Sequence, residues 1–322
     1  MSLLIQKSGI STTVQDLGRN GFRSFGINPN GAMDKTAVRL INILLGNNET
    51  EPVLEMHFPA PKFLFVESVT IALGGGNFGA EIDGEEIGSW RCVAVKKGNV
   101  LSFVQKKIGN RGYLSVKGGF QIENWLGSAS TNLKAKIGGL EGRNLQKNDR
   151  LYFKLKTNIE FQKPDYRISK SIIPPYRSLP KVRVVAGSEL GKLTAESRMN
   201  FFEGNFKVRN ESDRMGFRLH GENLYLGERL EMLSSAVDFG TIQLLPDGQM
   251  VILMADHQTT GGYPRLAHIA EVDLPLVAQL GSNDQVNFEL ITIAEAEDLI
   301  MRREKDLNLL RIACSFKNAR KF

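Results

Sequence analysis

The densest group of polar side chains lies in residues 256–264, where the chain reads Asp-His-Gln-Thr-Thr-Gly-Gly-Tyr-Pro. This block directly follows an apolar run, Met250 to Ala255, which is typical of a buried strand. Amide and hydroxyl groups at the end of a buried strand can bind a ligand, and two glycines let the backbone approach it closely. We therefore predict catalytic roles for Gln258, Thr259 and Thr260 and substrate binding for Tyr263. The alternative is a polar hairpin loop without a function.

A second group consists of arginines that stand beside glycine or in turn-rich sequence: Arg19, Arg91, Arg111, Arg143 and Arg214. The planar guanidinium group can bind a carboxylate or a phosphate through two parallel hydrogen bonds. As a set these arginines indicate an anionic substrate, although each one alone can have a structural role. We expect Arg214 to act in catalysis, and Arg19, Asp34 and Arg91 to bind substrate in the same cleft. The alternative for Arg214 is an internal ion pair.

Several other motifs lack the surrounding sequence that their usual function needs. Gly74 to Gly79 matches GxGxxG, the dinucleotide-binding motif, after an apparent strand. The following residues, Ala80 to Glu85, are typical of a hairpin, so the motif lacks the helix N-terminus that would bind a pyrophosphate. The four histidines, His57, His220, His257 and His268, are scattered, and no paired Cys/His spacing indicates a metal. GxSxG is also absent. His257 alone lies in a block that looks functional, where it can be a base or a hydrogen-bonded structural residue.

These candidate residues stand on a chain that reads mainly as short strands separated by glycine-containing turns. This pattern predicts a mainly β fold, with barrels or sandwiches as its usual outcome. Two helices are also expected. Asp34 can cap a helix over residues 35–45 that Gly46 ends, and a Thr292/Glu295 capping box opens a helix from Ile293 to Cys314.

The length of 322 residues predicts two domains. Three prolines between Ile172 and Pro180 indicate a linker. We therefore divide the chain into an N-terminal β-rich lobe (1–173), a linker (174–180), a C-terminal β-barrel lobe (181–292) and a C-terminal helix with a basic tail (293–322).

The composition is that of an ordinary globular protein, with 42% hydrophobic and 24% charged residues. Only two cysteines, Cys92 and Cys314, are present, and neither a signal peptide nor a membrane span is recognisable, so we expect a cytoplasmic protein. The formal charge of +6 is compatible with anionic ligands or an acidic partner, but a mildly basic soluble protein can carry it without either. The sequence contains no nucleic-acid-binding motif.

Several blocks in order along nearly the whole chain carry a resemblance to a known family. They are residues 12–34, 74–78, 90–91, 127–131, 138–143, 212–216, 240–243 and 256–264. Together they resemble the biotin-dependent carboxyltransferase family that includes the C-type 5-oxoprolinase subunits, also called the antagonist of KipI or allophanate hydrolase subunit 2 type. Two positions depart from its pattern: Ala129 stands where arginine is common, and Asp238-Phe239 replaces a proline-containing approach to Gly240.

The resemblance implies two β-rich lobes of cyclophilin-like barrel character. It also implies a role in an ATP-dependent complex that opens 5-oxoproline to glutamate, with a B-type, KipI-like subunit and an A-type subunit as partners and ATP shared with a partner. Biotin would have to come from another chain, because Ala32-Met33-Asp34 lacks the lysine of a biotinylation site. The alternatives are the carboxyltransferase component of a urea carboxylase-like system and a non-catalytic antagonist of a KipI-type kinase inhibitor.

Overall fold

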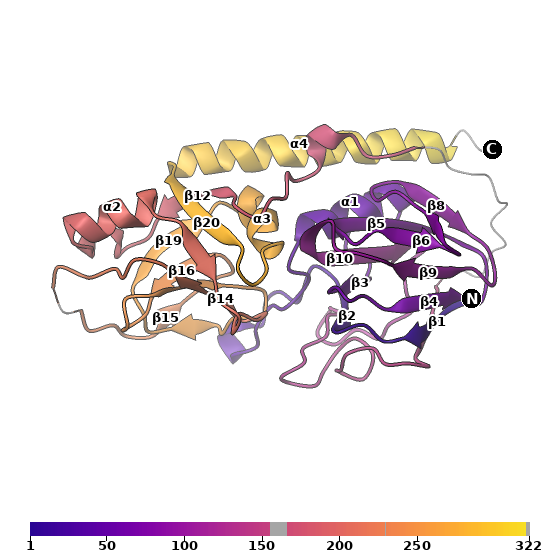
Figure 1. Cartoon of the computed structure of the whole chain (residues 1–322), viewed down its shortest axis with the longest axis horizontal. Coiled ribbons are helices and arrows are strands. Elements are labelled where there is room, and N and C mark those ends of the chain that lie inside the picture. Colours follow the sequence, from indigo (N-terminus) through magenta and orange to yellow (C-terminus); the bar gives the residue numbers. More distant parts are fainter. Residues whose placement is uncertain (155–165, 229, 320–322) are drawn as a thin grey trace. The chain divides into compact units, whose positions relative to one another are not determined.

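A computed structural model describes residues 1–154, 166–228 and 230–319 (Figure 1). The chain forms two compact units. Unit 1 comprises Met1–Arg19, Asn30–Pro174 and Glu304–Phe322, and unit 2 comprises Asn20–Pro29 and Pro175–Arg303. The two units are therefore not two consecutive stretches of the chain. Residues 20–29 belong to unit 2, and the C-terminal helix has residues in both units. The basic tail predicted at residues 317–321 lies outside the described side chains.

Unit 1 is built on two antiparallel sheets. In its described residues the first sheet has six strands in the order β11-β1-β4-β9-β6-β7, and the second has five in the order β2-β3-β10-β5-β8. The strands are β1 (Ser2–Lys7), β2 (Thr12–Gln15), β3 (Val53–Met56), β4 (Lys62–Phe65), β5 (Val69–Asn77), β6 (Ala80–Ile82), β7 (Glu85–Glu86), β8 (Cys92–Val95), β9 (Val100–Phe103), β10 (Ile108–Val116) and β11 (Arg150–Tyr152).

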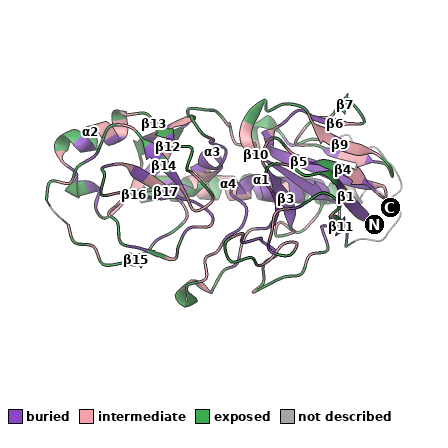
Figure 2. Ribbon diagram, turned by 60° about the horizontal axis from the view of Figure 1, so that its bottom comes forward, coloured by how far each residue is buried: buried purple, intermediate pink, exposed green. Residues whose placement is uncertain are grey.

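The core of unit 1 follows from the alternation of side chains along these strands. Ile5 of β1, Phe63 of β4 and Ile71 of β5 belong to one cluster that side chains of both sheets share. Figure 2 shows buried residues, in purple, along most of β3 and β5. Ala72, next to Ile71, faces the opposite side of its sheet and packs in a second cluster with helix α1 (Lys35–Leu45). Helix α1 lies so close to β5 that a Cβ at Gly74 would come 2.6 Å from Ile41 Cγ2.

The two predicted helices are confirmed. Asp34 caps α1 by accepting a hydrogen bond from Ala37 N, and Gly46 ends it in the left-handed conformation. Helix α4 (Ile293–Ala319) begins with the expected capping box: Thr292 N donates to Glu295 Oε2 and Glu295 N donates to Thr292 Oγ1. The glycine-rich residues 74–79 lie in and after β5 and lead into the β6–β7 hairpin, so the hairpin predicted after them is also confirmed.

Unit 2 contains a closed barrel with the strand order β12-β19-β16-β17-β14-β13-β20. Its pairs are antiparallel except for the parallel pair of β12 and β20. The strands are β12 (Lys181–Ala186), β13 (Phe206–Val208), β14 (Gly216–His220), β16 (Thr241–Leu244), β17 (Met250–Leu253), β19 (Arg265–Ile269) and β20 (Gln285–Leu290), and a short separate sheet pairs β15 (Ser235–Ala236) with β18 (Thr260–Gly261). The mainly β fold with a barrel is thus confirmed.

Unit 2 also contains short helices. They are α2 (Ala195–Glu203), α3 (Leu274–Ala278) and the 3-10 turns η1 (Arg23–Phe25), η3 (Leu190–Lys192) and η4 (Glu271–Asp273), while η2 (Lys170–Ile172) belongs to unit 1. Phe201 of α2 stacks on Phe288 of β20, with ring centroids 5.0 Å apart. This stacking fixes α2 against the barrel wall.

Candidate functional site

The predicted site residues are distributed over both units. Arg214, Gln258 to Thr260 and Tyr263 lie in unit 2, whereas Arg19, Asp34 and Arg91 lie in unit 1. A single cleft that holds all of them stays a prediction.

In unit 2, Arg214 forms a two-point ion pair with Asp256, the first residue of the polar block. Its Nε lies 2.9 Å from Oδ2 and its Nη2 lies 3.0 Å from Oδ1 of Asp256. The backbone adds a hydrogen bond from Asp256 N to Arg214 O, and Asn28 Nδ2 donates to Asp256 O at 3.0 Å. Three segments distant in sequence are thereby joined at Asp256.

His257 is almost fully buried, with 1% of its surface exposed. Its Nδ1 lies 2.5 Å from Gln258 O. Because a carbonyl oxygen can only accept, Nδ1 donates to it. Nε2 of the same ring lies 3.9 Å from Oδ1 of Asp238. The Gln258 carbonyl and the Asp238 carboxylate therefore lie beside the two ring nitrogens of His257.

The rest of the polar block pairs with the segment that carries Asp238. Thr260 pairs with Ala236 in the short β15–β18 sheet, and Val237 N donates to Thr259 O at 3.2 Å. The side chain of Gln258 is exposed. Thr259 and Thr260, two of the four residues predicted as catalytic, therefore pair with the segment that leads to Asp238. Direct action of Gln258, Thr259 and Thr260 on a substrate stays a prediction.

A hollow of about 290 Å³, here called the charged hollow, opens on this part of unit 2. Its lining combines two arginines, an acid, a histidine and a threonine with small residues: Arg23, Gly187, Ser188, Ala236, Val237, Asp238, Thr241, Arg265, Ala267 and His268. Its volume lies at the lower end of the range for small-molecule sites. We take this hollow as the candidate active site.

Asp238 lies near both Arg23 and His257. Its Oδ2 lies 3.2 Å from Nη1 of Arg23, whose Nη2 also donates to Val237 O. Its Oδ1 accepts from Phe239 N and faces His257. The two carboxylate oxygens of Asp238 therefore lie near two different groups, the Arg23 guanidinium and the buried His257 ring.

His268 faces the hollow from β19, and its Nδ1 lies 3.3 Å from Thr241 Oγ1. Partial removal of water lowers the pKa of His268, and the nearby Asp238 carboxylate opposes this shift without cancelling it. The ring is therefore neutral near pH 7. In the tautomer that donates from Nδ1 to Thr241, its Nε2 is free to accept a proton.

Arg265, the second arginine of the hollow, is oriented by Glu189. Arg265 N donates to Glu189 Oε2 at 2.8 Å and the guanidinium contacts both carboxylate oxygens. With Arg23 it makes the hollow suitable for an anionic group, in line with the arginine content of the sequence.

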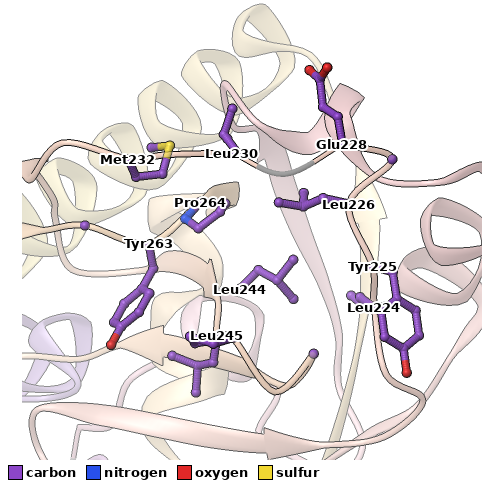
Figure 3. A pocket seen from close by; sticks show the side chains of 14 residues that line it. Leu224, Tyr225, Leu226, Glu228, Leu230, Met232, Leu244, Leu245, Tyr263 and Pro264 are labelled. Carbon is purple, nitrogen blue, oxygen red and sulfur yellow. The ribbon is translucent and has the colours of Figure 1, made fainter.

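Tyr263 lies at a different hollow. Together with Gly262 and Pro264 it lines a larger space of about 630 Å³, shown in Figure 3, in which most of the lining side chains are apolar. The end of the polar block 256–264 therefore lines a space other than the charged hollow.

In unit 1, Arg19 is 1% exposed and has internal contacts. Its Nη1 donates to Asn30 Oδ1, its Nη2 donates to Ser130 O, and its guanidinium lies over the Trp125 ring at 5.1 Å. Nearby, Asp16 accepts from Ser128 Oγ, Ala129 N and Ser130 Oγ. Two blocks that carry the family resemblance, 12–34 and 127–131, therefore meet here and stabilise each other.

Asp34 and Arg91 also have local contacts. Asp34 is fully buried, caps α1, and donates from its backbone N to Tyr113 Oη, which in turn donates to Glu55. Burial and the carboxylates of Glu55 and Asp34 raise the pKa of Tyr113. Arg91 is exposed just before β8 and forms an isolated β-bridge with Arg167. Substrate binding by any of Arg19, Asp34 and Arg91 stays a prediction.

Five residues of the hollow carry no signal of their own in the sequence: Arg23, Asp238, Thr241, Arg265 and His268. Asp238 stands out in the sequence only as a departure from the family pattern, and His268 only as one of four scattered histidines. Their proximity arises from pairing of β16 with β19 and from residues 20–29, which no local pattern predicts.

The described ranges of the chain contain no group of three or more His, Cys, Asp or Glu side chains that could hold a metal ion. Within the same ranges, no helix is long and apolar enough to cross a membrane.

Comparison with known proteins shows which family the chain belongs to. Residues 25–290 match the model of the carboxyltransferase domain, subdomain A and B. The chain is 38% identical to the 5-oxoprolinase C subunit of Haemophilus influenzae, over 95% of this chain and 96% of the relative, and 35% identical to the 5-oxoprolinase C subunit of Escherichia coli, over 91% and 93%. The crystal structure of the K. lactis urea amidolyase is similar with a TM-score of 0.88 and 29% identity, over 96% of this chain but 20% of that one. The chain therefore belongs to the carboxyltransferase family of subdomains A and B.

Proposed function

We propose that this chain is the C subunit of an ATP-dependent 5-oxoprolinase complex, which opens 5-oxoproline to L-glutamate. The observation that carries the proposal is the match to two 5-oxoprolinase C subunits along nearly the full length of both proteins. The charged hollow supports the proposal, because Arg23 and Arg265 suit the carboxylate of 5-oxoproline and the small volume suits its five-membered ring.

The chemistry of the reaction defines what the hollow would have to do. An amide carbonyl is a poor electrophile, and transfer of the γ-phosphoryl group of ATP to its oxygen activates the carbon. Water then adds, the ring nitrogen leaves as an amine, and a second water releases phosphate from the resulting acyl phosphate. Neutral His268 would accept the proton of the attacking water, and Arg23 and Arg265 would hold the substrate carboxylate.

ATP is proposed to bind together with a partner subunit. The glycine-rich residues 74–79 of this chain lie at the end of β5 and lead into the β6–β7 hairpin, not into a helix, so they do not fit a pyrophosphate cradle. We further propose that the partners are a B-type, KipI-like subunit and an A-type subunit, and that the complex acts in the cytoplasm.

The test is reconstitution from purified subunits. Glutamate should form from 5-oxoproline only when this chain, its partner subunits and ATP are all present. Glutamate formation that persists without this chain would contradict the proposal. Assembly with a B-type subunit without turnover of any substrate would favour the non-catalytic antagonist.

A second candidate function is transfer of a carboxyl group to urea. The fold match to the K. lactis urea amidolyase, over 96% of this chain, favours it. In that case biotin would be supplied by another chain. The same reconstituted subunits, given urea, bicarbonate, ATP and a biotinylated carrier protein, would then consume urea and leave 5-oxoproline intact.

A further inference from the structure

The lining of the charged hollow contains one carboxylate, that of Asp238, beside two arginines, Arg23 and Arg265. The side chain of Asp238 is 57% exposed, so a ligand in the hollow can reach it. In the proposed reaction the two arginines hold the substrate carboxylate and His268 accepts a proton, whereas Asp238 has no role. A negative group placed beside Asp238 would be repelled. The group that Asp238 binds must therefore carry a hydrogen-bond donor or a positive charge.

Asp238 is held next to His268 by a shared neighbour. The backbone N of Asp238 donates to Thr241 Oγ1 at 3.1 Å, and the same hydroxyl oxygen lies 3.3 Å from Nδ1 of His268. Phe239 N donates to Oδ1 of Asp238 at 2.8 Å. The Thr241 hydroxyl thus contacts both the residue that carries the carboxylate and the ring that would activate water.

The carboxylate of Asp238 can accept further hydrogen bonds. Besides the bond from Phe239 N, its Oδ1 lies 3.9 Å from Nε2 of His257 and its Oδ2 lies 3.2 Å from Nη1 of Arg23. A carboxylate offers about four acceptor positions, which is more than these neighbours occupy. A donor group of a ligand can therefore bind Asp238 while Arg23 stays in place.

Arg265 can likewise bind a ligand, although it contacts Glu189. The two N–O distances of this pair are 3.3 and 3.4 Å, whereas strong ion pairs have distances of about 2.7–2.9 Å. The charged hollow thus offers cations for a carboxylate and, at Asp238, an acceptor for a donor group.

5-Oxoproline carries both kinds of group on one carbon atom, which bonds to the carboxylate and to the ring nitrogen. The N–H of that ring is a donor. In the product L-glutamate the same nitrogen is an α-ammonium group, beside the same carboxylate. A contact between two ionised groups is stronger than a hydrogen bond from a neutral N–H. A carboxylate placed like that of Asp238 would therefore hold the product more tightly than the substrate.

We propose that Asp238 is a specificity-determining residue of the charged hollow, which binds the ring N–H of 5-oxoproline and, after ring opening, the α-ammonium group of L-glutamate. This inference rests on the proposed function for the identity of the two ligands. Product that stays in the hollow competes with new substrate, so L-glutamate inhibits the complex. Because Asp238-Phe239 departs from the family pattern, this inhibition is a property of this chain and not of the whole family.

The test measures the affinity of the purified full chain for L-glutamate, 5-oxoproline and glutarate by isothermal titration calorimetry. Glutarate has the two carboxylates of L-glutamate but no nitrogen. Wild type should bind L-glutamate at least about 10-fold more tightly than glutarate, the difference that one hydrogen bond between charged groups produces. Asp238→Asn keeps the size of the side chain and an acceptor for Phe239 N, but it loses the charge. It should weaken binding of L-glutamate at least about 10-fold, weaken 5-oxoproline less, and leave glutarate binding equal or tighter.

The matched control is Asp247→Asn. Asp247 is exposed in the same unit, and its Oδ1 likewise accepts from a nearby backbone N, that of Gln249. This variant should bind all three ligands like wild type. A wild-type chain that does not bind L-glutamate, or binds it no more tightly than glutarate, would overturn the inference even if Asp238→Asn does not fold. Equal affinity of wild type and Asp238→Asn for L-glutamate would overturn it as well.

The proposed function is tested separately, by glutamate formation in the reconstituted complex. If the complex forms glutamate and Asp238→Asn binds L-glutamate like wild type, the inference alone is wrong. If binding of L-glutamate depends on Asp238 but the complex forms no glutamate, the proposed function alone is wrong.

Discussion

Arg214 and Asp256 form a two-point ion pair at the start of the polar block, with N–O distances of 2.9 and 3.0 Å. Their side chains are 14% and 12% exposed. An arginine held in this way orients the residues that follow Asp256, including His257. It can therefore influence a reaction without touching the substrate.

Arg214→Ala should lower the free energy of unfolding by about 2 kcal/mol, since it leaves a poorly hydrated carboxylate without its charged donor. Arg214→Lys should lower it less, because lysine keeps the charge but loses the second contact. Urea denaturation measures both. Arg218→Ala, which replaces an exposed arginine of β14, is the control and should change stability little. Unchanged stability with a large loss of turnover per folded molecule would instead favour the direct catalytic role predicted from the sequence.

Asp34 should act as a helix cap. Asp34→Ala removes the acceptor of Ala37 N and should lower the free energy of unfolding by about 1–2 kcal/mol. Asp34→Ser keeps a capping oxygen and should recover part of this loss. The turnover of the folded Asp34→Ser variant should match wild type. A variant that is as stable as wild type but does not bind substrate would show that the binding role predicted from the sequence is correct.

His268 should make stability depend on pH. Because its pKa is lower in the folded protein, the unfolded chain binds the proton more readily. The stability that the neutral ring contributes is full above the unfolded pKa of about 6.5 and is lost as pH falls toward the folded value. Between pH 7 and pH 5, wild type should therefore lose more unfolding free energy than His268→Asn. Equal losses in the two proteins would contradict this linkage.

The elements of this fold that depend on local signals could be predicted from the sequence. Asp34 and Gly46 bound α1, and the Thr292/Glu295 pair opens α4, because caps are formed by neighbours in the chain. The apolar run before Asp256 likewise yields β17. The face that α4 buries is different, because it depends on packing: the structure buries Cys314 and exposes its neighbour Ala313.

The charged hollow could not be predicted in the same way. Arg23 contacts Val237 across 214 positions of sequence, and Asn28 contacts Asp256 across 228. No local pattern contains such contacts. The composition of residues 256–264 is enough to single out that block, but whether its side chains bind ligand or hold Asp238 in place depends on the pairing of β15 with β18.

If the charged hollow of this chain takes part in opening 5-oxoproline, the reaction should depend on His268. The most direct measurement is kcat of the assembled complex, followed by glutamate release with saturating ATP, for His268→Gln and for the control His220→Gln, which replaces an exposed histidine of β14 in the same unit. We expect both variants to assemble like wild type and His220→Gln to keep wild-type kcat. His268→Gln should lose about 100-fold or more, as expected for removal of a general base. Wild-type kcat in an assembled His268→Gln complex would contradict a role of the hollow in the reaction.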